Sequence, residues 1–368
     1  MRVMHVTFDM RIGGTEMVIK NIIEGNSDAN IEMSIYCIEA PLGPWGEDLK
    51  ASGTPIAVEE RQPGFDKSLI SKIRKHIKGN DIDILHCHQY TPWVYGALAA
   101  AFTKTKVVFT EHGRFYPDSS SWKRRLINPF LTCTTDKITT ISYATKSALT
   151  EFEFIPMRKI SVIYNGINEL KLNKDNPAIA KESFQIPKDS FVLGTIARFD
   201  PIKNHLMMLE AFALARETNL KLFLIIVGDG DERQNIERKI DNLGIKEHVL
   251  LTGYQPNPSR ILALFDIFLL SSLSEGTSMT LLESLSLRIP CVVTDAGGNS
   301  EIIIDEYNGL VTPNNDALAY AKAILKSSSI DLEELRTNAR TSFEEHFTNT
   351  KMVKSYIAIY NELVRSKP

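Results

Sequence analysis

The sequence predicts an α/β protein made of two doubly wound domains that face each other across a cleft. Short β-branched runs alternate with amphipathic stretches along both halves of the chain, which is the pattern of parallel sheets covered by helices on both faces. A polar segment with two prolines, residues 168–188, interrupts this alternation and is typical of a linker. At 368 residues, the chain also exceeds the usual size of a single hydrophobic core. We therefore expect domains at residues 1–170 and 171–349.

The first half contains strand candidates with helical periodicity between them. The predicted strands are Val3–Phe8, Met33–Ile38, Ile56–Glu59, Ile82–His86, Val107–Thr110, Ile138–Ser142 and Ile160–Tyr164. The predicted helices are Thr15–Glu24, Ser68–Ile77, Val94–Phe102 and Tyr143–Phe152.

The second half repeats the pattern and ends in a strongly helical segment, Thr350–Val364, which follows another helical pattern. Its predicted strands are Phe191–Ala197, Leu222–Val227, Val249–Thr252, Ile267–Leu270, Val292–Thr294 and Leu310–Val311. Its predicted helices are His205–Arg216, Glu232–Leu243, Ser259–Leu264 and Ser278–Ser286, and Gly244 stands where a helix C-cap is needed.

The charge distribution argues against a nucleic-acid-binding protein, because the formal net charge is -3 and such domains are strongly basic. Charge is nevertheless uneven: the region Lys67–Arg125 holds eleven Lys and Arg against four Asp and Glu. Two interpretations remain open for this basic region. It forms solvated helix faces, or it is a surface drawn to anionic lipid head groups or a phosphorylated acceptor.

The four cysteines show no pairing motif or metal-ligand spacing, which fits reduced thiols in a cytosolic protein. No apolar signal core stands at the N-terminus, and no run approaches the roughly 20 apolar residues of a membrane-spanning helix. We therefore expect a cytoplasmic protein, with peripheral association at the inner face of the cell membrane as the alternative.

Because ligands of doubly wound sheets bind beyond the carboxyl ends of the strands, the strand ends are the places to search for chemistry. One strand ends at Ala197 and is followed by two cations, Arg198 and Lys203. A guanidinium fork and a mobile ammonium together can neutralise a diphosphate leaving group without a metal ion. The alternative is a pair of surface cations.

A second strand ends near Leu270 and leads to Glu275 and to a helix that begins near Ser278. The backbone N–H groups of Ser278, Met279 and Thr280 favour an anion, and the Glu275 carboxylate can accept hydrogen bonds from sugar hydroxyls. Glu283 lies nearly opposite the leucines of this helix on a helical wheel. Periodicity alone is therefore satisfied by a solvated glutamate.

Two glycines, Gly228 and Gly230, follow a third strand and permit a close backbone approach to a ligand. The third glycine of a dinucleotide-binding motif is missing, which argues against NAD. The acidic pairs Asp229/Asp231 and Asp81/Asp83 resemble metal-binding carboxylates, but turn and helix-start roles are the preferred interpretation.

In the first half, Gly13 and Gly14 form a glycine loop between a strand and a helix, where a phosphate or an acceptor can approach the helix N-terminus. His112 ends another strand and can bond a sugar hydroxyl or a phosphate. His86 and His88 share one strand face. They make a poor metal site, because the sequence places no carboxylate or further histidine beside them.

These motifs, taken in combination and order, resemble family 4 of the retaining glycosyltransferases, which have the GT-B fold of two Rossmann-like domains. The resemblance spans essentially the whole chain and rests on the following segments: Gly13-Gly14-Thr-Glu16, Asp83–His88, Ile163–Gly166, Gly194–Asn204, Gly228-Asp-Gly230 and the pair Glu275/Glu283.

The resemblance implies a role for each motif. Arg198 and Lys203 would bind the donor diphosphate, Glu275 the hydroxyls of the donor sugar, and Glu283 the ribose. His112 would lie near O6 of the donor sugar or the reacting centre. The rest of the donor site would be formed by Gly14, Gly228, Gly276, Thr277, Ser278, Met279 and Thr280, with Gly253 and Tyr254 at the base, and Gly13, Gly14 and His112 would line the acceptor side.

The resemblance also implies a retaining transfer that needs no metal and no cofactor beyond the nucleotide sugar. In it the leaving phosphate helps to deprotonate the acceptor, so Glu275 is not a nucleophile of the kind found in retaining glycosidases. The helix at residues 350–366 would pack back on the first domain. The expected donor is a UDP-sugar, with a GDP-sugar next, and the expected acceptor is a glycan or lipid-linked hydroxyl in cell-surface polysaccharide biosynthesis.

Other functions on this architecture remain possible from the sequence. They are a nucleotide-sugar epimerase, a sugar phosphorylase, and a sugar-nucleotide-binding protein without catalysis. One departure from the family pattern bears on substrate choice: Thr277 and Ser278 stand where relatives often have a bulky apolar residue and a proline.

Overall fold

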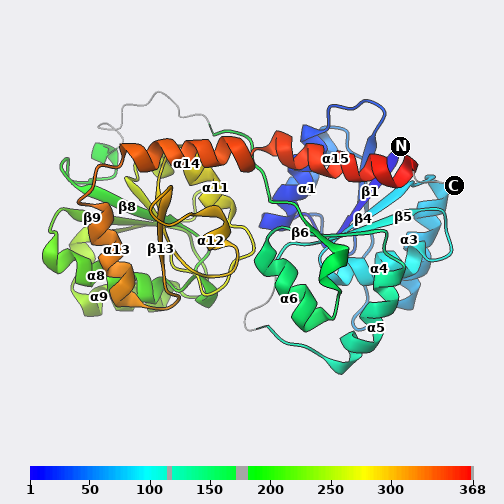
Figure 1. Cartoon of the computed structure of the whole chain (residues 1–368), viewed down its shortest axis with the longest axis horizontal. Coiled ribbons are helices and arrows are strands. Elements are labelled where there is room, and N and C mark those ends of the chain that lie inside the picture. The colour runs from blue at the N-terminus through cyan, green and yellow to red at the C-terminus, as the bar shows by residue number, and fades with distance from the viewer. Residues whose placement is uncertain (114–117, 171–180, 366–368) are drawn as a thin grey trace. The chain divides into compact units, whose positions relative to one another are not determined.

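The computed structural model describes residues 1–113, 118–170 and 181–365, and part of the predicted linker, residues 171–180, lies outside them. The chain divides into two compact units. The first unit comprises Met1–Asn168 together with Thr348–Pro368, and the second unit comprises Glu169–Phe347. Figure 1 shows a sheet flanked by helices in each unit.

The sheet of the first unit is entirely parallel, with the order β3-β2-β1-β4-β5-β6-β7. The strands are β1 (Arg2–Thr7), β2 (Glu32–Cys37), β3 (Ile56–Val58), β4 (Ile84–His88), β5 (Lys106–Glu111), β6 (Lys137–Thr140) and β7 (Ile160–Val162). The central strands are buried on both faces, as the unbroken apolar runs predict.

Six helices of the first unit cover its sheet in the described part of the chain before residue 168. They are α1 (Gly14–Gly25), α2 (Pro44–Ala51), α3 (Lys67–Gly79), α4 (Tyr90–Ala100), α5 (Trp122–Cys133) and α6 (Tyr143–Glu153). The sequence pattern did not indicate α2 or α5. Asp66 caps α3 by accepting hydrogen bonds from the backbone of Ser68 and Leu69.

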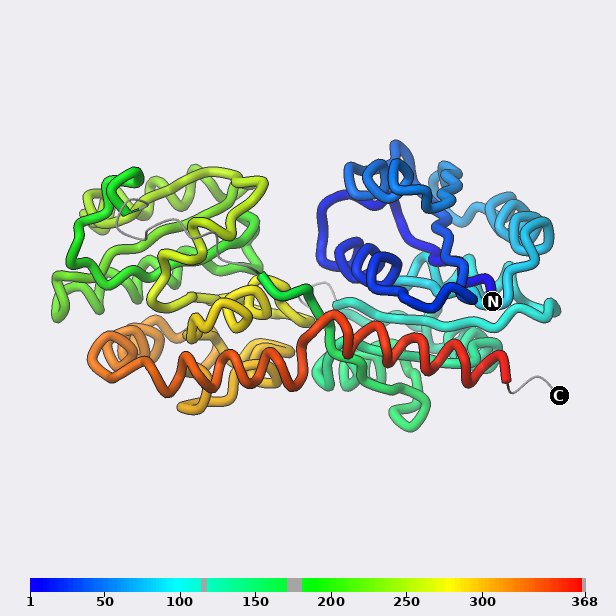
Figure 2. The backbone as a smooth tube through the Cα atoms, turned by 90° about the horizontal axis from the view of Figure 1, so that it is seen from above, coloured from blue at the N-terminus to red at the C-terminus, as the bar shows by residue number. Residues whose placement is uncertain are grey.

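The last helix, α15 (Asn349–Arg365), belongs to the first unit and packs against α1. In Figure 2 it is the red segment that runs alongside the blue and cyan elements of this unit. Its inward face includes Tyr356 and Tyr360, which are fully buried.

The sheet of the second unit is also parallel, with the order β10-β9-β8-β11-β12-β13. Its strands are β8 (Phe191–Ile196), β9 (Leu222–Val227), β10 (Val249–Gly253), β11 (Ile267–Leu270), β12 (Cys291–Thr294) and β13 (Gly309–Thr312). Its helices are α8 (His205–Thr218), α9 (Arg233–Leu243), α10 (Ser259–Leu262), α11 (Met279–Ser286), α12 (Asn299–Ile302), α13 (Ala317–Ser327) and α14 (Glu333–His346). Gly244, at φ +66, ends α9 as predicted.

The two sheets share one feature that positions the candidate sites. In each, the strand order reverses beside the first strand of the unit, between β1 and β4 and between β8 and β11. The loops that leave the carboxyl ends of these strand pairs diverge to opposite sides and leave room for a ligand. The predicted two-domain α/β class is confirmed.

Candidate functional site

Two loops meet at the reversal point of the second unit, one after β8 and one after β11. They are joined by backbone and side-chain hydrogen bonds: Leu273 N donates to Ile202 O at 2.8 Å, and Ser271 Oγ donates to Lys203 O at 2.9 Å. The two loops are therefore one structural piece that carries both groups of predicted site residues.

The structure brings Lys203 and Glu275 into direct contact. Lys203 Nζ lies 2.5 Å from Glu275 Oε1, and Ser272 Oγ donates to the same oxygen at 2.6 Å. The two side chains are only 23% and 10% exposed. Among the described residues no donor reaches Glu275 Oε2, so this oxygen is the one left to accept a bond from a ligand. Sequence reasoning missed Ser272.

Arg198 lies on the same loop but is much more open, with a side chain that is 76% exposed. Its guanidinium binds Asp200 at 2.7 Å, and Asp200 in turn accepts from Ile202 N at 3.1 Å. Although burial acts to raise it, the pKa of Asp200 is lowered by the Ile202 N–H and the Arg198 guanidinium. One guanidinium nitrogen of Arg198 is thus held by Asp200, and the exposed remainder of the guanidinium is accessible to an anion.

The glycines after β9 are required by close packing on the Arg198 loop. Gly228 has φ +146, and a Cβ there would lie 1.9 Å from Ala197 O. A Cβ at Gly230 would lie 2.5 Å from Phe199 O. Asp229 closes this turn by accepting hydrogen bonds from Gly230 N and from Arg233, which is the turn role that the preferred interpretation expected.

The neighbouring strand ends complete the rim of this region. Gly253 O accepts from Gly228 N at 3.0 Å, and Tyr254, which follows it, is 59% exposed. On the other side, Gly298 N donates to Glu275 O, and a Cβ at Gly297 would lie 2.0 Å from the same oxygen. The glycine pair after β12, Gly297 and Gly298, therefore positions Glu275. This role of the two glycines was not recognised from the sequence.

The start of α11 lacks a side-chain cap. Ser278 occupies the N-cap position in an extended conformation, and its hydroxyl contacts the Thr280 hydroxyl at 3.0 Å instead of a backbone N–H. Thr277, Ser278 and Met279 are buried, and Gly276 is partly exposed. An uncapped N-terminus beside Lys203 and Glu275 is a suitable place for an anionic group.

Glu283 differs from the solvated residue that its position on the helical wheel suggested. It is largely buried on α11, and burial raises its pKa to about 7. Helix α11 is surrounded by other elements of the second unit, α14 among them, which its own periodicity does not show. Among the described residues no side chain bonds this carboxyl, which leaves it available to a ligand.

This burial predicts a pH-dependent stability that Glu283→Gln removes. Between the ordinary pKa of 4.5 and about 7, the folded protein keeps a proton that the unfolded chain releases. The free energy of unfolding should therefore fall as the pH rises through this window, by roughly 3 kcal/mol from this group. In urea unfolding, the difference in free energy of unfolding between Glu283→Gln and the wild type should therefore grow as the pH rises through this window. If the two free energies changed in parallel with pH, the buried Glu283 carboxyl would not be the cause.

In the first unit, the glycine loop after β1 leads into α1 without a side-chain cap. Gly13 is the N-cap in extended conformation, and Gly14 is the first helical residue. A Cβ at Gly14 would meet no atom within 4 Å, so packing within the chain does not demand a glycine there. The space is open to a group that approaches the helix N-terminus.

His112 follows β5 at the same sheet edge and belongs to a cluster that sequence reasoning only partly found. His112 Nε2 lies 2.8 Å from His88 Nδ1, and His88 Nε2 lies 2.9 Å from His5 Nδ1. His5 stands on β1 directly beside His86 on β4. The sequence alone does not place a further histidine beside His86 and His88, because the order of the strands is needed to bring His5 there.

The trio of His5, His86 and His88 has ligand atoms close enough together for a metal ion. However, His86 already uses both ring nitrogens, which lie 2.7 Å from Tyr360 OH and 2.7 Å from Thr110 Oγ1. His88 also uses both of its nitrogens. A metal would have to displace these bonds, so the geometry favours a hydrogen-bonded network.

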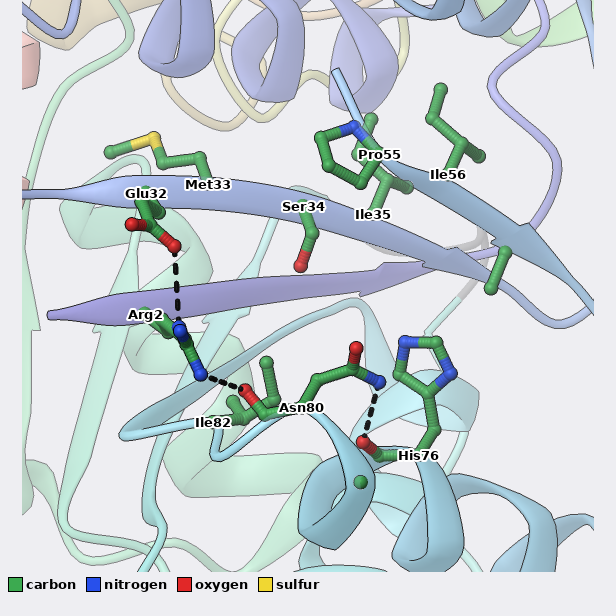
Figure 3. Close-up of a pocket in the computed structure, with 12 residues that line it drawn as sticks. Arg2, Glu32, Met33, Ser34, Ile35, Pro55, Ile56, His76, Asn80 and Ile82 are labelled. Atoms are coloured by element: carbon green, nitrogen blue, oxygen red, sulfur yellow. Dashed lines mark hydrogen bonds and ion pairs between the residues drawn. The ribbon is translucent and has the colours of Figure 1, made fainter. Parts of the chain in front are cut away.

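A cavity of about 400 Å³ opens at the opposite edge of the first sheet, where the strands begin (Figure 3). Its polar groups bond one another: Arg2 pairs with Glu32 at 3.2 Å and donates to Asn80 O, and Asn80 donates to His76 O. No predicted site residue lines it, and it lies away from the strand ends that carry chemistry.

Comparisons with known proteins agree with these features. Residues 12–169 match the family described as Glycosyltransferase Family 4, and residues 178–343 match Glycosyl transferases group 1. The chain is 30% identical to the N-acetyl-alpha-D-glucosaminyl L-malate synthase of Bacillus anthracis, over 82% of this chain and 81% of that protein.

Other relatives cover the chain more fully. It is 28% identical to an Escherichia coli UDP-Gal:alpha-D-GlcNAc-diphosphoundecaprenol alpha-1,3-galactosyltransferase, over 100% of this chain and 98% of that protein. Among solved structures, Anabaena Alr3699/HepE in complex with UDP superposes with a TM-score of 0.87 at 19% identity, over 98% of this chain and 100% of that one.

Proposed function

The chain belongs to family 4 of the glycosyltransferases and has the GT-B fold that its sequence predicts, and on that premise we propose a retaining transfer from a UDP-sugar to a glycan or lipid-linked hydroxyl. The observation that carries this proposal is the 2.5 Å contact between Lys203 and Glu275 at the reversal point of the second sheet. It sets a cation for phosphate directly beside a carboxylate for sugar hydroxyls.

In the proposed mechanism, Lys203 and Arg198 stabilise the negative charge that grows on the diphosphate as the bond to the sugar breaks. The positive end of the α11 dipole adds a further positive field. Because these groups supply the positive charge, the proposed reaction requires no divalent metal. Glu275 Oε2 accepts from the donor sugar, and Glu283 accepts from the ribose.

Relatives support the choice of donor and acceptor. One is described as using UDP-Gal and a diphosphoundecaprenol acceptor, two are O-antigen biosynthesis glycosyltransferases of Escherichia coli, and the Anabaena structure contains UDP. We therefore propose UDP as the nucleotide and a growing lipid-linked glycan as the acceptor.

A thermal-shift panel of nucleotide sugars tests the donor. A ligand present at 100 times its dissociation constant should stabilise the folded protein by about 2.7 kcal/mol. A UDP-sugar should raise the melting temperature, in the presence of EDTA as well as in its absence. Stabilisation by none of the UDP- or GDP-sugars, or only with added divalent metal, would contradict the proposal. Product analysis with the stabilising donor, with and without a lipid-linked acceptor, then separates transfer from epimerisation.

The acceptor proposal includes contact with an anionic membrane. In the described part of the chain no helix is long and apolar enough to span a bilayer. Helix α5, however, exposes Trp122, Leu126 and Phe130, four residues apart on one stripe, at 70%, 69% and 54%. Lys123 and Arg125 on the same helix form no ion pair among the described residues. Exposed apolar groups next to cations are typical of interfacial helices.

Several cations of the basic region Lys67–Arg125 are bonded within the protein and are therefore less available to a lipid head group. Four members are occupied within the protein: Lys72 by Glu59, Arg74 by carbonyls at the end of α4, Lys106 by Asp136, and Arg124 by Glu153. Arg114 lies outside the described residues. The stripe on α5 is therefore a stronger argument for membrane contact than the total charge.

Replacing Trp122 and Phe130 by serine should weaken binding to vesicles that contain phosphatidylglycerol. The bound fraction at limiting lipid should fall at least tenfold, because each of these side chains contributes about 1.5–3 kcal/mol when fully buried. Leu220→Ser is a matched control, since Leu220 is 74% exposed on the second unit. Equal vesicle sedimentation of the wild type and the double variant would refute membrane contact through α5.

A further inference from the structure

Three histidines of the first unit form a linear chain of hydrogen bonds, His5–His88–His112. Each contact joins two ring nitrogens, at 2.9 Å between His5 Nδ1 and His88 Nε2 and at 2.8 Å between His88 Nδ1 and His112 Nε2. The two remaining nitrogens, His5 Nε2 and His112 Nδ1, are buried and have no partner in the described part of the chain.

All three rings are neutral at physiological pH. Burial lowers the pKa of His5 and of His112 to about 3. Burial, reinforced by the neighbouring histidines, holds the pKa of His88 well below its ordinary value. A neutral imidazole carries one N–H and one bare nitrogen, so each ring can donate once and accept once.

This rule leaves the chain only two states. In one, His5 Nδ1 donates to His88, His88 Nδ1 donates to His112, and the His112 proton is on Nδ1. In the other, every bond is reversed, and His112 Nδ1 has no proton. The tautomer of His112 is therefore coupled through His88 to that of His5, which lies on a different strand.

The surroundings of the two ends select between these states. His5 is fully buried in β1, whereas His112 is partly exposed in the loop after β5. A buried N–H without an acceptor is rarer in proteins than a buried acceptor without a donor. Both end nitrogens are buried, but His112 lies in the partly exposed loop at the sheet edge where ligands bind, so an oxygen from outside the chain can accept from His112 Nδ1 and not from His5 Nε2. The bare nitrogen therefore belongs at His5 Nε2, and the N–H belongs at His112 Nδ1.

We propose that His88 and His5 are positioning residues that hold His112 as the Nδ1–H tautomer, so that it donates a hydrogen bond from Nδ1 to an oxygen of the bound substrates. This inference rests on the proposed function for the identity of that oxygen, a sugar hydroxyl or a phosphate oxygen. The state of the histidine chain itself does not depend on that function.

Two substitutions at His88 test its two hydrogen bonds, to His5 and to His112, separately. An asparagine amide reaches the position of the imidazole Nδ1, so His88→Asn keeps a donor for His112 and loses the bond to His5. A glutamine amide reaches the position of Nε2, so His88→Gln keeps the bond to His5 and leaves His112 without a donor. Tyr360→Phe is a control, because it removes a partner of His86 in the same buried cluster and leaves the chain intact.

Long-range proton–nitrogen NMR of histidine-labelled protein reads the tautomers without substrate. The expected result is an Nδ1–H tautomer of His112 in the wild type, in Tyr360→Phe and in His88→Asn, and loss of that preference in His88→Gln. An Nε2–H tautomer in the wild type, or an unchanged tautomer in His88→Gln, would overturn the proposal.

Turnover with the donor found by thermal shift tests the link to function. The kcat of His88→Gln should fall at least about tenfold, less than the roughly 10²- to 10³-fold expected when a preorganised donor is deleted outright, because the His112 ring is still present. KM should change less than kcat, and His88→Asn should retain most of the wild-type kcat. Equal losses in the two variants would overturn the positioning role. If the wild type transfers no sugar, the proposed function is wrong, but the NMR result still decides the tautomers of His5, His88 and His112.

Discussion

Replacing Lys203 by alanine is expected to lower kcat by about 10²- to 10³-fold, as the loss of one preorganised group at a developing charge does in other enzymes. The ammonium is held by Glu275 at 2.5 Å and is only 23% exposed, so it is in place before the reaction and needs little reorganisation. Single-turnover kinetics at saturating donor measure the effect on the chemical step.

Lys203→Arg and Arg198→Ala are useful companions in this experiment. Lys203→Arg retains the charge and should recover part of the rate. Arg198→Ala should leave the free energy of unfolding nearly unchanged, since Arg198 is 76% exposed, but should still lower kcat. Unimpaired turnover in both alanine variants would show that these cations do not serve the diphosphate.

The second large effect is expected for Glu275→Gln, which keeps the shape of the side chain and removes its charge. The variant loses the ionic bond to Lys203 and weakens the bond to the donor sugar, and hydrogen bonds to charged groups contribute about 1.5–3 kcal/mol each. We therefore expect kcat to fall by roughly 10- to 100-fold, whereas affinity for UDP alone changes little, because Glu275 is assigned to the sugar.

Calorimetric titration with UDP and with the UDP-sugar distinguishes these contributions. The double variant with Lys203→Ala should be less impaired than the product of the two single effects, because the residues are in contact. A Glu275→Gln protein that loses UDP affinity as strongly as turnover would contradict the assignment to the sugar.

Most of the fold follows from sequence periodicity because its strands are buried on both faces. The predicted strands Leu222–Val227 and Ile267–Leu270 agree with the structure at both ends. Helix α5 was not recognised, since its apolar residues Trp122, Leu126 and Phe130 face outward and Pro129 interrupts the pattern. A rule that assigns apolar residues to the core cannot find a helix whose apolar face is exposed.

The candidate site was predictable where its chemistry lies next to a strand end. Arg198, Lys203 and Glu275 follow apolar runs directly, and the structure brings Lys203 and Glu275 together. The burial of Glu283 was not predictable, because periodicity shows which face of α11 is apolar and not which elements of the fold surround the helix. His5 likewise became part of the histidine chain only once β1 was known to pair with β4.

The return of α15 to the first unit has a consequence for the order of synthesis. The second unit, Glu169–Phe347, is an insertion within the first, and its own residues are complete before the ribosome has made α15. Until then the face of the first unit that receives Tyr356 and Tyr360 is uncovered, and His86 lacks its Tyr360 partner. The second unit can therefore fold first during translation, and the first unit closes around its histidines only after α15 has left the ribosome.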